Sequence, residues 1–412
     1  MGKTLAFRDV PGKNFLLVLI RPLKPLKVAI LTTDNREHFR NYGERKVVFG
    51  TAPEALLQGL AGLPEVEVHV VACTQQPMVS PEKLAPNIWF HSLHVPKTGW
   101  MRTLYQGCIR ATRKKLREIQ PDIVHGQGTE RDCAVSAVLS GFPNVLTIHG
   151  NMNAIARLHH SRPGSFQWLA AKVENFTLPR TGGIICISEY VQDLVKTTPV
   201  PTWLVPNAIQ RMFFEFPRAV PPPRARPLLI NVGVISERKR QVELLARLTA
   251  LRAQKLEFDT IFVGKAAPTE YPAIFHRQLA AADQAHGGFK HIEKLDDPGF
   301  CRLMDEAAAM IHFSNEESFG LTFAEAIARG LYLFASDVGA ARFIARGVER
   351  VQVFNLDDWA GLETSVGQWL RAGGDRQPRP AEAPQAFRQT FHPTAVARRH
   401  LEIYRSVLKI DS

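Results

Sequence analysis

Residues 314–326 read SNEESFGLTFAEA and follow the short apolar run Ala309–Phe313. The apolar run predicts a buried strand, and Gly320 followed by several helix-forming residues predicts a helix at 321–329. A strand that passes through a polar loop into a helix is the repeating unit of a parallel α/β sheet. Glycine allows a ligand to approach the backbone closely, and the free N–H groups of residues 320–322 form an anion site suited to a diphosphate.

The same alternation continues on both sides of this stretch. Short apolar runs predict strands, each followed by a helical pattern, and this implies βαβ units in parallel sheets. Ligands of such sheets bind at the carboxyl ends of the strands, so two facing sheets predict a site in the cleft between them. The expected strands are 27–32, 66–71, 121–125, 144–149, 183–187, 228–232, 259–263, 289–293, 309–313 and 331–335. The expected helices span 101–119, 130–140, 163–178, 240–253, 270–283, 298–307, 321–329 and 394–409. Two further helices are expected to begin after residues 50 and 188.

Proline-rich segments divide the pattern. Five prolines within 217–227 interrupt any helix or sheet and predict a domain boundary. A second such stretch, 377–393, precedes the last helix. We therefore predict an N-terminal extension at 1–26, one α/β domain at 27–216 and a second at 217–393, each of them Rossmann-like and doubly wound.

Charge is uneven along the 412 residues. Residues 1–210 hold 24 Lys and Arg against 15 Asp and Glu (+9), and residues 211–412 hold 27 against 24 (+3), which makes the net charge +12. A basic first half points to an acidic partner, namely nucleic acid, an anionic membrane or a phosphate-bearing substrate. Five scattered cysteines, without a C-x-x-C pair, indicate reduced thiols rather than disulfides or a zinc site. The apolar run Phe15–Ile20 is too short to span a bilayer, so we expect a cytoplasmic protein.

Two acids flank the predicted anion site. Glu317 precedes the helix, and Glu325 lies about one turn inside it. A carboxylate accepts two hydrogen bonds from a vicinal diol, so this pair suits a sugar at one end of a diphosphate and a ribose at the other. A capped helix with two solvated acids is the alternative.

The stretch resembles the E-x7-E signature of the retaining GT-B glycosyltransferases, in particular glycosyltransferase family 4. The resemblance rests on Phe313-Ser314, on Glu317 to Leu321, on Glu325-Ala326 and on Ala335-Ser336-Asp337-Val338-Gly339. It implies a GT-B fold, in which 27–216 binds the acceptor, 217–393 binds the nucleotide sugar, and the closing helix 394–412 returns to the first domain. By resemblance, Glu317 holds hydroxyls of the donor sugar and Glu325 holds the ribose. The loop Ser318, Phe319, Gly320, Leu321 and Thr322 receives the diphosphate.

A second part of the predicted site follows the strand 228–232, where residues 231–240 read NVGVISERKR. Three consecutive cations at a strand end can neutralise a departing diphosphate. The family pattern is V-G-R-x4-K. Gly233 and Lys239 match it, whereas Val234 stands where the family has Arg. Arg238 and Arg240 are the two candidates to supply the positive charge that the family's Arg provides. The non-functional interpretation is that these cations simply form the exposed start of a helix.

The resemblance extends over roughly residues 27–410 through shorter segments. Thr147-Ile148-His149-Gly150 resembles the turn that faces the donor sugar, which implies a catalytic role for His149 beside Glu317 and Lys239, although a lone strand-end histidine is otherwise structural. Gly264 resembles the glycine at the next strand end. The loop 34–46 lacks the glycine pair that family members often carry, so it is expected to be either a mobile surface loop or an acceptor-shaping loop, with Gly50 and Thr51 bordering the site.

The implied function is retaining, metal-independent transfer of a sugar from a UDP- or GDP-linked donor to a hydroxyl acceptor. It would serve bacterial-type polysaccharide or glycolipid assembly without a further cofactor. The alternatives are an epimerase or phosphorylase on the same scaffold, and a non-catalytic anion- or nucleic-acid-binding module. No nucleic-acid motif supports the last, so we expect no nucleic-acid partner. The positive charge of the half that is expected to bind the acceptor points to an acceptor that is anionic or lipid-linked. Residues 100–117 form either a sheet-covering helix with a solvated basic face or a helix that lies on the inner face of a membrane.

Overall fold

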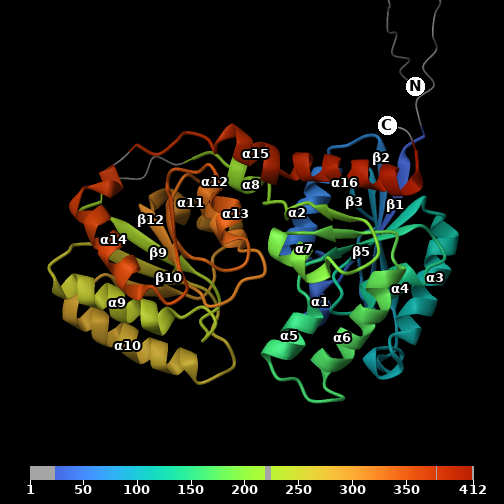
Figure 1. The fold of residues 1–412 in the computed structure, drawn as a ribbon, viewed down its shortest axis with the longest axis horizontal. Coiled ribbons are helices and arrows are strands. Elements are labelled where there is room, and N and C mark those ends of the chain that lie inside the picture. Colours follow the sequence, from blue (N-terminus) through green and yellow to red (C-terminus); the bar gives the residue numbers. More distant parts are fainter. Residues whose placement is uncertain (1–23, 219–223, 377, 411–412) are drawn as a thin grey trace, which may run out of the picture.

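The computed structural model describes residues 24–218, 224–376 and 378–410, so the expected extension at 1–26 lies almost wholly outside the described part. The chain forms two β-sheets that lie side by side, each with helices packed on its faces (Figure 1). Strands β5 (Ile123–Gln127), β6 (Asn144–Ile148) and β9 (Leu228–Val232) are buried along their whole length. Such burial is expected for parallel strands that are covered on both faces. The predicted architecture of two doubly wound α/β units is confirmed.

The first sheet has eight strands in the order β3-β4-β2-β1-β5-β6-β7-β8, and all of its pairs are parallel except β3 with β4. Strand order turns back between β1 and β5, where the carboxyl ends of the strands open a crevice for ligands. The remaining strands of this sheet are β1 (Leu26–Leu31), β2 (Val66–Thr74), β3 (Lys83–Ala85), β4 (Ile88–His94), β7 (Ile184–Cys186) and β8 (Thr202–Leu204).

The second sheet has six parallel strands in the order β11-β10-β9-β12-β13-β14. Its switch point lies between β9 and β12, so the loops that follow these two strands are neighbours. Both predicted nucleotide-binding loops follow them. The other strands are β10 (Asp259–Val263), β11 (Phe289–Ile292), β12 (Ala309–His312), β13 (Tyr332–Ser336) and β14 (Val351–Phe354).

Sixteen α-helices connect and cover these strands in the described part of the chain. In the first half they are α1 (Asn35–His38), α2 (Thr51–Leu60), α3 (Gln106–Ile119), α4 (Asp132–Val138), α5 (Met152–Leu158), α6 (Phe166–Thr177), α7 (Glu189–Val195) and α8 (Met212–Glu215). In the second half they are α9 (Gln241–Ala253), α10 (Tyr271–His286), α11 (Asp297–Glu306), α12 (Leu321–Ala328), α13 (Ala341–Ala345), α14 (Trp359–Arg371), α15 (Gln385–Phe391) and α16 (Pro393–Leu408).

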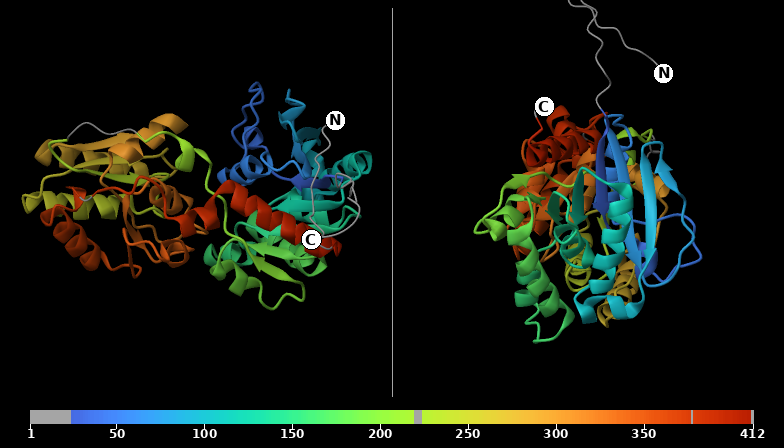
Figure 2. Two further views of the ribbon diagram at one scale, coloured as in Figure 1. Left: turned by 90° about the horizontal axis from the view of Figure 1, so that it is seen from above. Right: turned by 90° about the vertical axis from the view of Figure 1, so that its right-hand side faces the viewer.

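Helix α16 leaves the second half and crosses onto the first (Figure 2). It packs closely against α2, where a Cβ on Gly59 would lie 2.1 Å from the carbonyl oxygen of Pro393. The hydroxyl of Tyr404 in α16 hydrogen-bonds Nδ1 of His125 in β5 at 2.7 Å, and both side chains are buried. The C-terminal helix is therefore part of the core beneath the first sheet. Among the residues that the structure describes, no helix is both long and apolar enough to cross a membrane.

Several elements differ from the sequence prediction. The predicted helix 101–119 begins only at Gln106, because Leu104 and Tyr105 have left-handed backbone (φ 49° and 62°) that ends two short 3-10 turns. Strands β3 and β4 and helix α5 were not predicted. Strand β14 and helix α14 were also missed. These elements mix polar and apolar residues over only three to thirteen positions, so their pattern is weak.

The segment 34–46 is buried at its start and mostly exposed over residues 38–46, so both interpretations of this loop stay predictions. Arg36 is fully buried, and its Nη2 lies 2.6 Å from Oδ2 of Asp34, itself fully buried. Its Nη1 donates to the carbonyl oxygens of Glu44 and Val79 at 2.7 and 3.0 Å. The buried guanidinium thus fastens this segment to the loop after β2, and the cost of burying it is offset by a paired charge and satisfied donors.

Candidate active site

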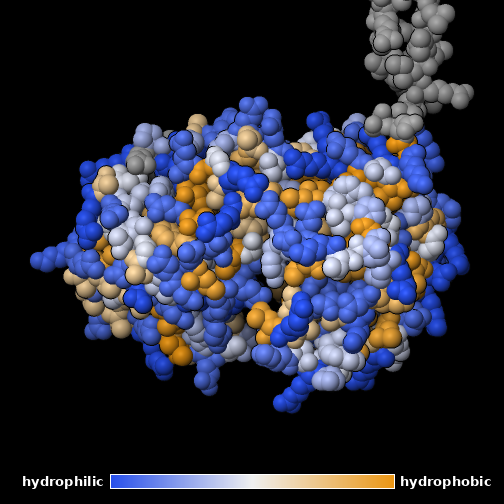
Figure 3. All heavy atoms as spheres, in the orientation of Figure 1, coloured by the Kyte–Doolittle hydropathy of each residue, from blue (hydrophilic) through white to orange (hydrophobic). Residues whose placement is uncertain are grey.

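A large cavity of about 1,210 Å³ lies between the two halves of the molecule. Figure 3 shows that the surface is hollowed there. Its first wall comes from His149, from α5 with the turn that follows it, and from Tyr190 in α7. Its second wall comes from Arg238 after β9, from residues 315–318 after β12, and from Val338 and Gly339 after β13. The loops at the carboxyl ends of three neighbouring strands thus meet one cavity.

Two glycines set the path of the backbone around Glu317. Gly320 has left-handed backbone (φ 92°), and a Cβ there would lie 2.7 Å from the Phe323 ring. Gly339 is also left-handed (φ 59°), and a Cβ there would lie 2.4 Å from the carbonyl oxygen of Glu317. Ser336 Oγ donates to the carbonyl oxygen of Ser314 at 2.6 Å. The loop after β13 therefore packs tightly against the loop that holds Glu317.

The carboxylate of Glu317 gathers three donors on one oxygen. Oε1 bonds Nζ of Lys239 at short distance and lies 3.1 Å from Nε2 of His312 and 3.3 Å from Oγ of Ser314. Oε2 has only a longer contact, 3.5 Å from Nη1 of Arg238. Oε2 therefore has the fewer partners of the two oxygens and is the one more open to a ligand. The side chain as a whole is 10% exposed.

These contacts determine the charge states of the cluster. Burial alone would raise the pKa of Glu317, but His312 and Lys239 outweigh it and hold that pKa well below its usual range. Burial lowers the pKa of Lys239, while Glu317 opposes this fall. Burial also lowers the pKa of His312, with Lys239 adding to the effect, so the imidazole is neutral. At neutral pH the cluster is a carboxylate and an ammonium beside a neutral histidine.

Lys239 reaches Glu317 across Gly233. A Cβ on Gly233 would lie 3.2 Å from Cδ and Cε of Lys239, so the glycine leaves room for the lysine stem. A Cβ on Gly264 would lie 2.0 Å from the carbonyl oxygen of Gly233. Gly264 is therefore needed for the packing of two backbone segments, and its predicted role at the ligand stays untested.

Arg238 ties the loops after β9 and β12 together. Its Nη1 donates to the carbonyl oxygen of Glu316 at 3.0 Å, and its own carbonyl oxygen accepts from the N–H of Asn315 at 3.0 Å. Its side chain is 45% exposed and lines the cavity. The two predicted anion-binding loops are thus joined by hydrogen bonds.

Arg240 takes a different direction. Its backbone is left-handed (φ 57°) where α9 begins, and its Nη2 lies 2.5 Å from Oδ1 of Asp357. Its guanidinium also stacks 4.6 Å from the ring centroid of Trp359. Val234, which stands at the family's arginine position, is 46% exposed. Of the two candidates for the missing charge, the structure brings Arg238 to the cavity and pairs Arg240 elsewhere.

The loop residues predicted to receive a diphosphate have different environments. Ser318 lines the cavity, whereas Phe319 is buried against Phe391. Leu321 and Thr322 are half-buried in the first turn of α12. The N–H groups of such a first turn have no partner within the helix, so they remain available to an anion.

Glu325 lies on the buried face of α12 and is 5% exposed. Burial raises the pKa of Glu325 to about 8, and the charge of Asp297 at the start of α11 adds to this. The same Asp297 also raises the pKa of Glu54 in α2, after burial as the main cause. Asp297 is therefore within electrostatic reach of Glu325 and also of Glu54, which belongs to the other half of the molecule.

The pKa of Glu325 leads to a prediction about stability. The ordinary pKa is 4.5, so the folded protein keeps a proton that the unfolded chain loses between pH 4.5 and about 8. Stability that is present below pH 4.5 is lost as the pH rises through this window. We expect Glu325→Gln to raise the free energy of unfolding at pH 8 by an amount on the order of a few kcal/mol, with little change at pH 5. Urea unfolding at both pH values measures this, and equal effects at the two would contradict it.

His149 lies on the first wall, where a hydrogen bond to the last residue of β5 holds its ring. Its Nε2 donates to Oε1 of Gln127 at 2.7 Å, and Nε2 of Gln127 lies 3.1 Å from Nε2 of His125. Burial lowers the pKa of His149 to about 4, so the imidazole is neutral at physiological pH. This places His149 at the cavity as predicted, while its role toward a ligand stays a prediction.

Gly50 and Thr51 begin α2 but do not line the large cavity. The next residue, Ala52, lines a small adjoining pocket together with His149 and Asn207. The predicted border position of Gly50 and Thr51 is therefore near His149, and any contact with a ligand stays a prediction.

Sequence reasoning missed several residues of the candidate site, one of them buried behind the cavity and the others on its first wall. His312 ends β12 and contacts both charged groups of the cluster. A polar residue at the end of a buried strand was the available signal. The first wall also contains side chains that no motif marked, because α5 and the turn after it were not predicted: Arg157, Leu158, His159 and His160. Buried Glu174 holds the start of α5 by accepting from the N–H groups of Met152 and Asn153 at 2.9 and 3.2 Å.

Comparisons with known proteins agree along the chain. The model of the family described as Glycosyltransferase Family 4 matches residues 54–211, and the model described as Glycosyl transferases group 1 matches residues 226–371. The comparison with curated proteins finds no match.

Solved structures show the same fold. Sucrose-phosphate synthase of Thermosynechococcus elongatus is 16% identical with a TM-score of 0.64, and the alignment covers 94% of this chain and 100% of that chain. A glycosyltransferase of Rickettsia africae is 14% identical, with the same coverage and TM-score. HepE of Anabaena, solved with UDP-glucose, is 13% identical with a TM-score of 0.67, covering 92% of this chain and 100% of that one. At such identities the likeness concerns the fold.

Proposed function

Since the chain belongs to the GT-B glycosyltransferases of family 4 and group 1, we propose that it is a retaining enzyme that uses a UDP- or GDP-linked sugar. A hydroxyl group of the acceptor would receive the sugar. The observation that supports this proposal is the cluster of three charged side chains in which Glu317 and Arg238 line the cavity, and buried Lys239 pairs with Glu317. It places two cations and one carboxylate beside the first turn of α12.

In the proposed mechanism the cations bind the diphosphate. As the bond between the sugar and the diphosphate breaks, negative charge builds on the leaving oxygen, and fixed positive groups lower the barrier. Lys239 and Arg238 supply charge, and the N–H groups at the start of α12 supply dipoles. Glu317 pairs with Lys239 and so holds the ammonium in position.

Glu317 is proposed to hold hydroxyls of the donor sugar through Oε2, its less occupied oxygen. Glu325 would bind the ribose, and His149 would contact the sugar from the first wall. Because Oε1 of Glu317 is committed to Lys239, we assign this carboxylate to positioning rather than to attack on the sugar. Retention then follows from same-face attack, in which the departing phosphate takes the proton of the acceptor hydroxyl.

The first wall is proposed to receive the acceptor. It carries one permanent cation, Arg157, together with three histidines and the exposed side chains of Leu158 and Tyr190. Such a surface suits an acceptor with both an anionic and an apolar part. A lipid-linked or anionic glycan precursor has this chemistry, so we place the enzyme in polysaccharide or glycolipid assembly at the cytoplasmic face of a membrane.

Donor identity can be tested by thermal unfolding. We expect one of UDP-, GDP- and ADP-sugars to raise the melting temperature, since a donor at a hundred times its dissociation constant stabilises by roughly 2.7 kcal/mol. The base that gives the largest shift identifies the donor class, and the product formed from it with a glycan acceptor distinguishes transfer from epimerisation or phosphorolysis. Absence of a shift with all three classes would contradict the proposal.

Metal independence gives a separate prediction. Because Lys239 and Arg238 are proposed to neutralise the diphosphate, we expect transfer to proceed without added divalent ions. Rates measured with excess Mg²⁺, without it, and after brief exposure to EDTA in the assay are expected to agree within about twofold. Loss of transfer in EDTA, with recovery on adding Mg²⁺, would refute metal independence.

A further inference from the structure

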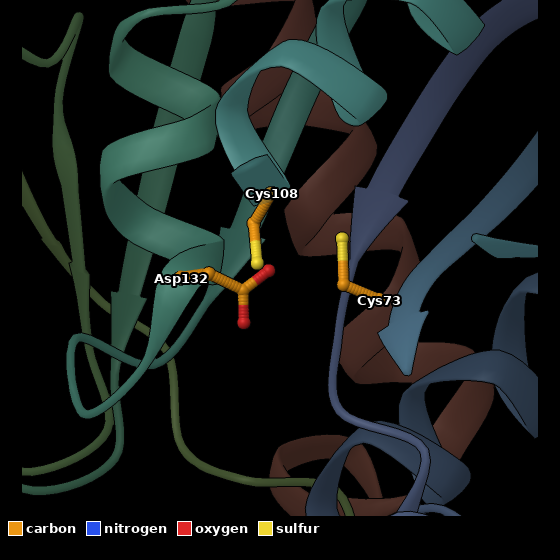
Figure 4. Close-up of side chains that lie close together, drawn as sticks. All are labelled: Cys73, Cys108 and Asp132. Carbon is orange, nitrogen blue, oxygen red and sulfur yellow. The ribbon is translucent and has the colours of Figure 1, made fainter. Parts of the chain in front are cut away.

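Three side chains from separate segments meet inside the first half of the molecule. Cys73 is near the end of β2, Cys108 lies in the first turn of α3, and Asp132 is the first residue of α4. Their donor atoms all lie within 4.8 Å of one another. Figure 4 shows the side chains pointing toward a common centre. This group lies apart from the cavity described above, because none of its members lines that cavity.

The group is enclosed by apolar side chains. Cys108 is fully buried, and Cys73 and Asp132 are 6% and 7% exposed. The surrounding cluster is formed by buried apolar residues of β2, α3, α4, α6 and the connecting turns, namely Val95, Trp100, Tyr105, Ile109, Val135 and Val173. Donor atoms in such a setting require partners, since burying a polar group without them is costly.

Asp132 has a basic neighbour, Arg131, whose charge acts on its carboxyl group without a direct ion pair. Within residues 24–218, 224–376 and 378–410, no salt bridge involves its carboxyl group. Its neighbour Arg131 lies over the ring of Trp100, 4.8 Å from the centroid. The hydrogen-bond donors of the carboxyl group are the N–H of Asp132 itself and the thiol of Cys73, and a thiol is only a weak donor. A buried carboxyl group that lies beside two thiols and forms no ion pair is a candidate metal ligand.

We propose that Cys73, Cys108 and Asp132 bind one divalent cation of the zinc class. Two thiolates and a carboxylate form a ligand set that zinc prefers over magnesium or calcium. Tetrahedral zinc, with bonds of about 2.3 Å to sulfur and about 2.0 Å to oxygen, sets its donor atoms roughly 3.5–3.8 Å apart. Donors that already lie within 4.8 Å need only small side-chain rotations to reach this spacing.

The binding step is balanced in charge and protons. Each thiol releases its proton to solvent, the two thiolates and the carboxylate bind the ion, and a water molecule completes the tetrahedron. Thr112 Oγ1, 3.7 Å from Sγ of Cys73, is placed to orient the bound sulfur. The ion would join β2, α3 and α4, and so would stabilise the fold rather than take part in sugar transfer.

Spectroscopy of the full-length protein can test the site. The protein, kept reduced and freed of metal, is titrated with Co²⁺ alone and then with Zn²⁺ as a competitor. We expect one Co²⁺ per chain, sulfur-to-cobalt charge-transfer absorption and the intense visible bands of a tetrahedral site, all lost on adding Zn²⁺. Cys108→Ala and Asp132→Asn are expected to bind on the order of 100-fold more weakly.

Cys186→Ala is the matched control. Cys186 is also fully buried in the first half but belongs to no group of potential metal ligands among the described residues, so this variant should bind Co²⁺ as the wild type does. Circular dichroism checks that each variant is folded. If Cys108→Ala does not fold, Asp132→Asn, which preserves the size of its side chain, carries the test. Failure of the folded wild type to bind Co²⁺ and Zn²⁺, or unchanged spectra in the variants, would overturn the proposal. A Cys73–Cys108 disulfide in protein that binds neither ion would do so too.

Discussion

Glu317→Gln is expected to lower the rate of sugar transfer by about 10²- to 10³-fold, the largest effect of any single substitution in the cavity. The amide keeps the shape of the side chain but removes the charge that holds Lys239 and the oxygen proposed to accept donor hydroxyls. Initial rates with the donor identified by thermal unfolding measure the effect. A rate within tenfold of the wild type would contradict the proposed role.

Stability complicates this experiment, because the substitution leaves a buried lysine without its counter-ion. Removing one member of such a pair costs about 3–5 kcal/mol. The double variant Glu317→Gln with Lys239→Met removes both charges and should unfold at a temperature closer to that of the wild type. If the double variant regains stability but not transfer, the loss arises from the site and not from unfolding. Glu363→Gln controls for the effects of expression and purification on a Glu→Gln variant. It removes a partly exposed carboxylate on α14, away from the cavity.

Lys239→Met is expected to have the second largest effect, also about 10²-fold or more on the rate. Methionine fills the passage beside Gly233 but cannot neutralise a departing diphosphate. We expect the affinity for the free nucleoside diphosphate to fall together with the rate, since the charge acts on both the bound and the departing diphosphate. Calorimetric titration with UDP and GDP measures the affinity separately from the chemistry.

Arg240→Met gives the informative comparison. Arg240 follows Lys239 directly in the sequence, yet its guanidinium is bound to Asp357 and Trp359. We expect its replacement to change the rate less than tenfold, and Arg238→Met to fall between the two. A larger loss at Arg240 than at Arg238 would show that the loop after β9 rearranges when the donor binds.

Local sequence was sufficient to predict the conformation of the loop that holds Glu317. A buried strand, a polar loop with Gly320 and the start of a helix lie within one short stretch, so its conformation depends mainly on neighbours in the chain. The loop after β9 was predictable only in part. Gly233 and Lys239 were expected, but the choice between Arg238 and Arg240 depended on a left-handed turn and on partners more than a hundred residues away.

Other features were beyond prediction because they join distant segments. The burial of Arg36 depends on Asp34 and on carbonyl groups of two loops. His312 was hidden within an apolar strand, and its importance follows from contacts with Lys239 and Glu317. Most of the first wall of the cavity was missed because α5 was not predicted.

The amino-acid sequence by itself determined the type and order of most strands and helices, the two-sheet architecture and the family. These follow from apolar periodicity and from motifs whose residues are close together in the chain. The tertiary structure alone decided which side chains meet: Lys239 with Glu317 and His312, Tyr404 with His125, and Cys73 with Cys108 and Asp132. Periodicity specifies which face of an element is buried, whereas contact between distant residues depends on loop conformation and packing that no short pattern encodes.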